Sequence, residues 1–208
     1  MCGIVGYTGY EQAAPLLIDG LSKLEYRGYD SAGLAIEEKE KIEVVRAKGR
    51  LRVLEEMTDN GKALHGFCGI GHTRWATHGE PSDANPHCNA KKTIAVVHNG
   101  IIENYQSLKE YLEKKGYQFE SETDTEVIAH LLDRYYKGDP LEAITKVMAR
   151  VTGSYALGIL FQDHPGKVFA VRKDSPMIVG SAPEGNFIAS DIPAILKYTK
   201  NVYFVNNM

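Results

Sequence analysis

Short apolar runs, each bounded by Gly or Asp, recur along this 208-residue sequence and constrain its fold more than any other feature. Runs of this length are typical of β-strands. Ten of them predict strands over Ile4–Thr8, Gly33–Glu37, Ile42–Ala47, Phe67–Thr73, Thr93–His98, Tyr155–Gln162, Lys167–Arg172, Met177–Gly180, Asn186–Ser190 and Val202–Val205.

Helical patterns fall in the intervals between these runs. Leu17, Leu21 and Leu24 recur at the spacing of one helical face. Asn104 is a suitable N-cap for a second helix, which Gly116 ends.

Two more helix starts carry capping signals. Thr123–Glu126 has the Ser/Thr-x-x-Glu form of a capping box, and Asp139 precedes Pro140, a residue favoured in the first turn. Strands and helices therefore do not alternate strictly as βαβ units. We expect an α+β fold of two mostly antiparallel sheets with helices outside, rather than a doubly wound parallel sheet.

Composition excludes several classes of protein. With 43% hydrophobic and 25% charged residues, the chain is expected to fold as one compact domain over residues 1–208. A net charge of −3 without a Lys/Arg-dense stretch argues against nucleic-acid or anionic-membrane binding. The sequence has no membrane-length apolar run and no secretory signal pattern, and its three cysteines are too few for a disulfide scaffold. We therefore expect a cytoplasmic protein.

Cys2 is the most informative single residue. Removal of Met1 would leave Cys2 with a free α-amine, whose pKa of about 7.7–8.0 suits a general base. One residue would then supply both nucleophile and base. The alternative is that Cys2 is simply a small apolar residue at the start of a strand.

His72–Gly79 follows a predicted strand and groups several polar side chains with the only tryptophan. Arg74 suits bidentate capture of a carboxylate, and Trp75 could cover a small ligand, with Thr77 and His78 nearby. The alternative is a surface arginine beside a packed tryptophan.

Asn99 and Gly100 follow the apolar run Thr93–His98. Asn-Gly is a hairpin signal, yet a helical pattern follows instead of a partner strand. A strand ending in a sharp turn would let the Asn99 amide and the Gly100 N–H act together as an oxyanion hole. Asp124, in the first turn of its helix, either binds a ligand ammonium or only stabilises the helix dipole.

Metal and nucleotide sites are not predicted. Cys68 and His72 share a strand face, but the sequence has no close-spaced pair of the C-x₂-C or H-x₃-H type. Gly69-x-Gly71 lacks the third glycine of a dinucleotide fingerprint. We therefore expect neither a metal nor a cofactor.

Taken together, several segments resemble the class II, or N-terminal-nucleophile, glutamine amidotransferases, and in particular their aminosugar-forming members. The matching segments are Cys2–Tyr7, Leu24–Gly33, Gly71–Ser82, Val96–Tyr105 and Ser121–His130, with a weaker match at Phe187–Asp191. The resemblance implies a four-layer αββα sandwich of two mostly antiparallel sheets, covering 1–208 as a glutaminase domain.

The resemblance also implies a role for each matching residue. Cys2 would be the nucleophile and Asn99 with Gly100 the oxyanion hole. Five further residues would bind or cover glutamine. Arg74 and Thr77 would hold its α-carboxylate and Asp124 its α-ammonium, Trp75 would be a mobile lid, and His78 would lie nearby. Arg27 would help to order the N-terminus. His87 keeps the family register, whereas Cys88 and Asn89 depart from it and are left out of the site.

The implied activity is hydrolysis of the L-glutamine side-chain amide through a Cys2 thioester. In longer members the ammonia passes to fructose 6-phosphate, giving glucosamine 6-phosphate in a sugar-phosphate isomerase half that this chain lacks. Such full-length chains are expected to be homo-oligomers. The alternative is a catalytically silent ammonia-gating or regulatory module, which a retained Met1 would favour.

Overall fold

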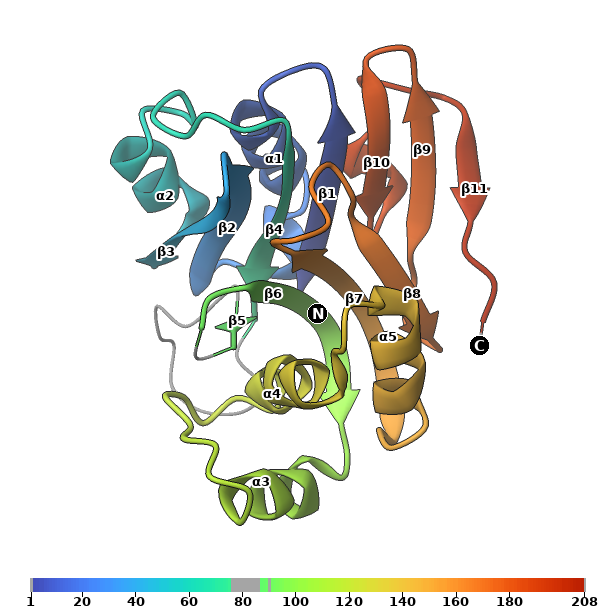
Figure 1. Ribbon diagram of the computed structural model, residues 1–208. Coiled ribbons are helices and arrows are strands. Elements are labelled where there is room, and N and C mark those ends of the chain that lie inside the picture. Colours follow the sequence, from blue (N-terminus) through green and yellow to red (C-terminus); the bar gives the residue numbers. More distant parts are fainter. Residues whose placement is uncertain (1, 76–86, 90, 208) are drawn as a thin grey trace.

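The computed structural model describes residues 2–75, 87–89 and 91–207, and these form two antiparallel β-sheets (Figure 1). The larger sheet has the order β11-β9-β10-β1-β4-β2-β3, and the smaller has the order β5-β6-β7-β8. The strands are β1 (Gly3–Gly9), β2 (Ser31–Glu38), β3 (Lys41–Lys48), β4 (Cys68–Arg74), β5 (His87–Cys88), β6 (Ile94–Ile102), β7 (Gly153–Phe161), β8 (Phe169–Lys173), β9 (Ile178–Ala182), β10 (Gly185–Ala189) and β11 (Val202–Phe204).

Helices cover the outer face of each sheet (Figure 1). Helix α1 (Ala13–Ser22) and the short α2 (Leu51–Met57) lie on the larger sheet. Helix α4 (Thr125–Tyr135) lies on the smaller sheet. Helices α3 (Tyr105–Glu113) and α5 (Pro140–Met148) both pack against α4. Two 3₁₀ turns, η1 (Glu25–Arg27) and η2 (Ile192–Ala194), complete the elements. This is the predicted four-layer αββα sandwich.

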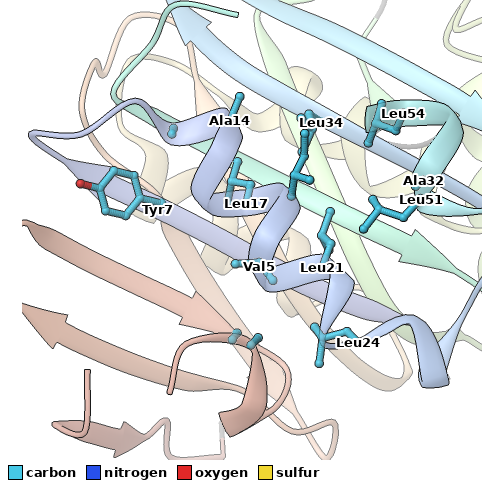
Figure 2. Packing of buried hydrophobic residues seen from close by; sticks show 14 of the residues in the cluster. Val5, Tyr7, Ala14, Leu17, Leu21, Leu24, Ala32, Leu34, Leu51 and Leu54 are labelled. Atoms are coloured by element: carbon cyan, nitrogen blue, oxygen red, sulfur yellow. The ribbon is translucent and has the colours of Figure 1, made fainter. Parts of the chain in front are cut away.

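Three apolar clusters match the three interfaces between layers. In the cluster between α1, α2 and the larger sheet, Leu17 and Leu21 pack near Val5 and Leu34 (Figure 2). A second cluster lies between the smaller sheet and its helices. The third lies between the two sheets and includes Ile4 of β1. Side chains that face this third layer are therefore buried between the sheets.

All ten predicted strands are present, with small shifts at their ends. The sequence missed β5, which is only two residues long, and α2, which buries only Leu51 and Leu54. Such short elements carry too few apolar residues to show a period. Leu24 lies beyond the end of α1, although it is fully buried in the same cluster.

The capping-box prediction was wrong. The N-cap of α4 is Asp124, and its side chain makes no capping hydrogen bond. Glu126 instead accepts hydrogen bonds from the backbone N–H groups of Glu120 and Ser121, and from the Ser121 hydroxyl. The carboxylate thus orders the loop before the helix rather than closing a box with Thr123. The predicted cap at Asp139 is correct, since its side chain accepts from two N–H groups of α5.

The expectation that the strand ends at Asn99-Gly100 was also wrong. Strand β6 continues to Ile102 and stays paired with β7 throughout, Asn99 opposite Ala156 and Gly100 opposite Tyr155. Gly100 has φ +128°, a region that favours glycine, and a Cβ there would overlap the Ser154 carbonyl oxygen. A local distortion within the strand therefore replaces the predicted turn.

Within the described residues, no helix is both long and apolar enough to cross a membrane.

Candidate active site

The alternation of side chains along the strands brings the predicted site residues into the layer between the sheets. Ile70 of β4 and Val97 of β6 both lie in the cluster between the sheets. Two residues further along each strand, His72 and Asn99 face the same layer, because side chains alternate with period two. Arg74, the last residue of β4, follows on that face and is buried.

Cys2 lies just before β1 and beside the end of β4. Gly3 pairs with Thr73, the penultimate residue of β4, so Cys2 lies beside the end of that strand and contacts Trp75, which follows it. The Trp75 N–H points at the Cys2 sulfur, 3.4 Å away, and the Cys2 thiol points at the Trp75 carbonyl oxygen at 3.6 Å. The backbone of Trp75 thus holds the sulfur from both sides.

The electrostatics of Cys2 favour the protonated thiol. Burial raises the pKa of the Cys2 thiol above its usual range, and the hydrogen bond from Trp75 and the Arg74 guanidinium offset part of this rise. At neutral pH the thiol therefore needs a base before it can act as a nucleophile.

Gly28 packs directly against the peptide bond between Arg74 and Trp75. A Cβ on Gly28 would lie 2.6 Å from the Arg74 carbonyl carbon, 2.7 Å from the Arg74 carbonyl oxygen and 2.9 Å from the Trp75 nitrogen. The Asp30 N–H donates to the same Arg74 oxygen at 3.2 Å. Only glycine permits this close packing, so the segment around Gly28 fixes the backbone that contacts Cys2.

Trp75 is 47% exposed, in contrast to the buried Arg74. Its ring meets the Tyr29 ring edge-on, with centroids 5.6 Å apart. Its role as a lid over the substrate stays a prediction. Thr77 and His78, the other two residues predicted in this segment, lie outside the described residues.

Asp124 is buried and lies beside the end of β6. Its Oδ2 accepts a hydrogen bond from the Ile102 N–H at 2.7 Å. The neighbouring Thr125 hydroxyl contacts His98 Nδ1 at 3.0 Å. These contacts hold the start of α4 against the His98–Ile102 end of β6, the segment that contains Asn99 and Gly100. Because the side chain makes no helix-capping hydrogen bond, capping does not account for its burial.

Arg27 was expected to help order the N-terminus, and its contacts lie with the Ser190–Asp191 segment. Its Nη2 lies 3.1 Å from Asp191 Oδ2, and Tyr26 donates to the same carboxylate oxygen at 2.6 Å. The preceding Ser190 accepts a hydrogen bond from the Ile4 N–H at 3.0 Å. Arg27 is thus connected to the start of β1 through the Ser190–Asp191 segment, without a direct contact to Cys2 among the interactions of the described residues.

Metal ligation has no support in the described part of the chain, where no group of three or more His, Cys, Asp or Glu side chains could hold an ion. Cys68 and His72 do face the same layer, as their spacing indicated, and the groups near the His72 ring include His98 and Asn99.

Sequence reasoning missed two residues of this site, Gly28 and His72. The sequence indicates no role for Gly28, although this residue lies in the matching segment Leu24–Gly33. It indicates His72 only as a potential metal ligand. The strand period of β4 could have revealed His72, since it lies on the same face as Ile70 and Arg74.

The fold, with a cysteine at the start of a central strand of the larger sheet, is that of amidotransferases of the N-terminal-nucleophile type. Glutamine phosphoribosylpyrophosphate amidotransferase from B. subtilis matches 98% of this chain and 44% of its own with a TM-score of 0.83 at 26% identity. A class-II glutamine aminotransferase domain protein from Silicibacter pomeroyi shares the fold with a TM-score of 0.61 at 15% identity, over 99% of this chain and 92% of its own.

Residues 72–197 match the family model described as a glutamine amidotransferase domain, and the chain belongs to this family. Two curated relatives, from Caldanaerobacter subterraneus subsp. tengcongensis and Thermus thermophilus, are 60% and 51% identical over the whole chain. Both are named glutamine–fructose-6-phosphate aminotransferase (isomerizing). The chain spans about a third (34%) of the length of these relatives.

Proposed function

We propose that this chain is a glutaminase domain that hydrolyses the side-chain amide of L-glutamine through a Cys2 thioester. One observation carries the proposal. The Cys2 sulfur is held by the Trp75 backbone in the layer that Asn99 also faces, next to the buried Arg74. A thiol, an amide donor and a guanidinium in one place fit acyl transfer on an amino-acid substrate.

The first half of the reaction forms the thioester. Once Met1 is removed, the α-amine of Cys2 takes the thiol proton and the sulfur attacks the glutamine amide carbon. The Asn99 amide and the Gly100 N–H stabilise the oxyanion. The amide C–N bond then breaks, and the protonated amine supplies the proton that ammonia needs to leave.

The second half releases glutamate. Water, deprotonated by the same amine, attacks the thioester carbon, and the C–S bond breaks to restore the thiol. In this proposal Arg74 and Thr77 bind the substrate carboxylate, with His78 nearby, and Asp124 binds the ammonium. Trp75 would cover the bound substrate.

The names of the longer relatives support a proposal about a full-length chain. We propose that in a full-length chain the ammonia reaches fructose 6-phosphate and yields glucosamine 6-phosphate, in a sugar-phosphate isomerase half beyond this chain. Residues 1–208 would then be its glutaminase domain. Homo-oligomerisation of that full-length chain and a cytoplasmic location are further parts of the proposal. The unpaired state of Cys2, Cys68 and Cys88 supports a reducing compartment.

The test is to follow glutamate, ammonia and aminosugar in the same reaction. The protein is supplied with glutamine and fructose 6-phosphate after intact mass has verified that Met1 is absent. We expect glutamate and free ammonia without glucosamine 6-phosphate. Aminosugar formation would mean that the acceptor site lies within this chain, whereas absence of glutamate would favour the silent regulatory module.

A further inference from the structure

His72 is a buried imidazole that the proposed reaction does not use. It is 3% exposed, and neither ring nitrogen has a hydrogen-bond partner that meets normal geometry among the described residues. Leaving a buried polar group without a partner costs about 1–3 kcal/mol. A group of this kind calls for a functional explanation.

Asn99 carries a buried acceptor that also lacks a hydrogen-bond partner among the described residues. This atom is the carboxamide oxygen Oδ1. The oxygen is an acceptor, whereas a neutral imidazole carries one N–H donor. The donor that Asn99 lacks is therefore of the kind that His72 offers.

The two side chains meet between the sheets. His72 is two residues beyond Ile70 on β4, and Asn99 is two residues beyond Val97 on β6, so both point into the same layer. Both the His98 backbone and the Asn99 side chain act on the His72 ring as hydrogen-bonding groups that raise its pKa, so both lie within reach of the ring. Neither contact meets normal hydrogen-bond geometry.

We propose that His72 is a positioning residue that donates an N–H to Asn99 Oδ1 and so fixes which end of the carboxamide faces the substrate. This inference rests on the proposed function. An Asn amide stabilises an oxyanion only through its NH₂ group, and a 180° flip would present the oxygen instead. Occupying the oxygen with a donor from behind prevents that flip.

His72 has the protonation state that this task requires. Burial, helped by the His98 and Arg74 side chains, lowers the pKa of His72 to about 3, although the His98 backbone and the Asn99 side chain act in the opposite direction. The ring is therefore neutral throughout the physiological range. It cannot act as the general base for Cys2 and still hold its N–H on Asn99 without becoming a buried cation.

The kinetic test compares His72→Leu, His72→Gln and His130→Leu with the wild-type protein. His72→Leu removes the donor, and His72→Gln restores an N–H. The control His130→Leu removes an equally buried imidazole of α4 that contacts Glu126. We expect His72→Leu to lower kcat about 10- to 100-fold with KM within about two-fold, since complete loss of an oxyanion-hole donor costs ~10²–10³.

His72→Gln is expected to recover a substantial part of kcat, and His130→Leu to keep wild-type kcat despite lower stability. Equal kcat values for His72→Leu and wild type would overturn the proposal. So would a loss in His72→Leu that appears in KM alone, or one that His72→Gln does not reduce.

A second measurement does not depend on glutaminase activity. In the wild-type protein, ¹⁵N NMR should show His72 as a neutral imidazole with one slowly exchanging ring N–H, and Asn99→Leu should shift or abolish that signal. If wild type fails to hydrolyse glutamine while this signal is present, the proposed function fails but the contact stands. If the signal is unaffected by Asn99→Leu, the His72–Asn99 contact is refuted.

Discussion

Gly28→Ala is expected to disable the site without adding or removing any polar group. The added methyl carbon would lie 2.6–2.9 Å from three backbone atoms of the Arg74–Trp75 peptide. Carbon contacts are normally about 3.5–4.0 Å. The peptide must therefore move by roughly 1 Å, since backbone atoms cannot rotate aside as a flexible side chain would.

The size of the effect follows from what this peptide contacts. It donates the Trp75 N–H to the Cys2 sulfur at 3.4 Å and carries the Arg74 side chain. A misplacement of about 1 Å at a reacting group costs on the order of 10²-fold in rate. Overpacking of this kind also destabilises a fold by about 1–3 kcal/mol. We expect kcat/KM for glutamine to fall about 100-fold while the protein remains folded.

The assay measures glutamate release together with urea unfolding. Gly116→Ala is the control. Gly116 has φ +90°, so alanine there costs about 1–2 kcal/mol of backbone strain, and its Cβ would meet nothing within 4 Å. That variant should lose stability and retain turnover. Wild-type kcat/KM in Gly28→Ala would refute the claim that this peptide holds Cys2 in place.

Three further predictions follow from the same geometry. Asp124→Asn should keep the contact to the Ile102 N–H yet lower kcat/KM at least ~30-fold, mainly through KM, since loss of one partner of a buried charge pair costs about 2–5 kcal/mol; an unchanged KM would contradict it. Gly100→Ala should abolish turnover, measured as ammonia release, because its Cβ would overlap the Ser154 carbonyl oxygen. Burial would raise the pKa of Glu126, but hydrogen bonds from His130 and the loop before α4 lower it to about 2 from 4.5. The unfolding free energy should therefore fall as pH drops from about 4.5 toward 2, and urea titrations of Glu126→Gln should lack this part of the fall.

Much of the fold could be predicted because its signals are local. Strands such as β1 and β7 are bounded apolar runs, and Asp139 followed by Pro140 marks a helix start within four residues. The helices and strands do not alternate strictly, which already favours antiparallel sheets. Each of these patterns depends only on neighbours in sequence, so the sequence alone is sufficient.

The site depends on contacts between distant segments, which the sequence does not encode locally. Asn-Gly normally signals a turn, yet pairing with β7 keeps Asn99 and Gly100 within a strand. The sequence places Asp124 inside the first turn of a helix, whereas its carboxylate binds a backbone group of β6. His72 gains its significance only when β4 packs against β6, because that packing brings it to Asn99.

Site-specific labelling of Cys2 tests the central claim most directly. The protein, with Met1 verified absent, is treated with a glutamine-mimicking electrophile and analysed by intact mass and peptide mapping. We predict one adduct per chain, on Cys2 alone, because burial raises the pKa of the Cys68 thiol to about 12 and only Cys2 carries a neighbouring α-amine. Excess glutamine should slow the labelling. Modification of Cys68 or Cys88 at a comparable rate, or labelling that glutamine does not slow, would contradict the account.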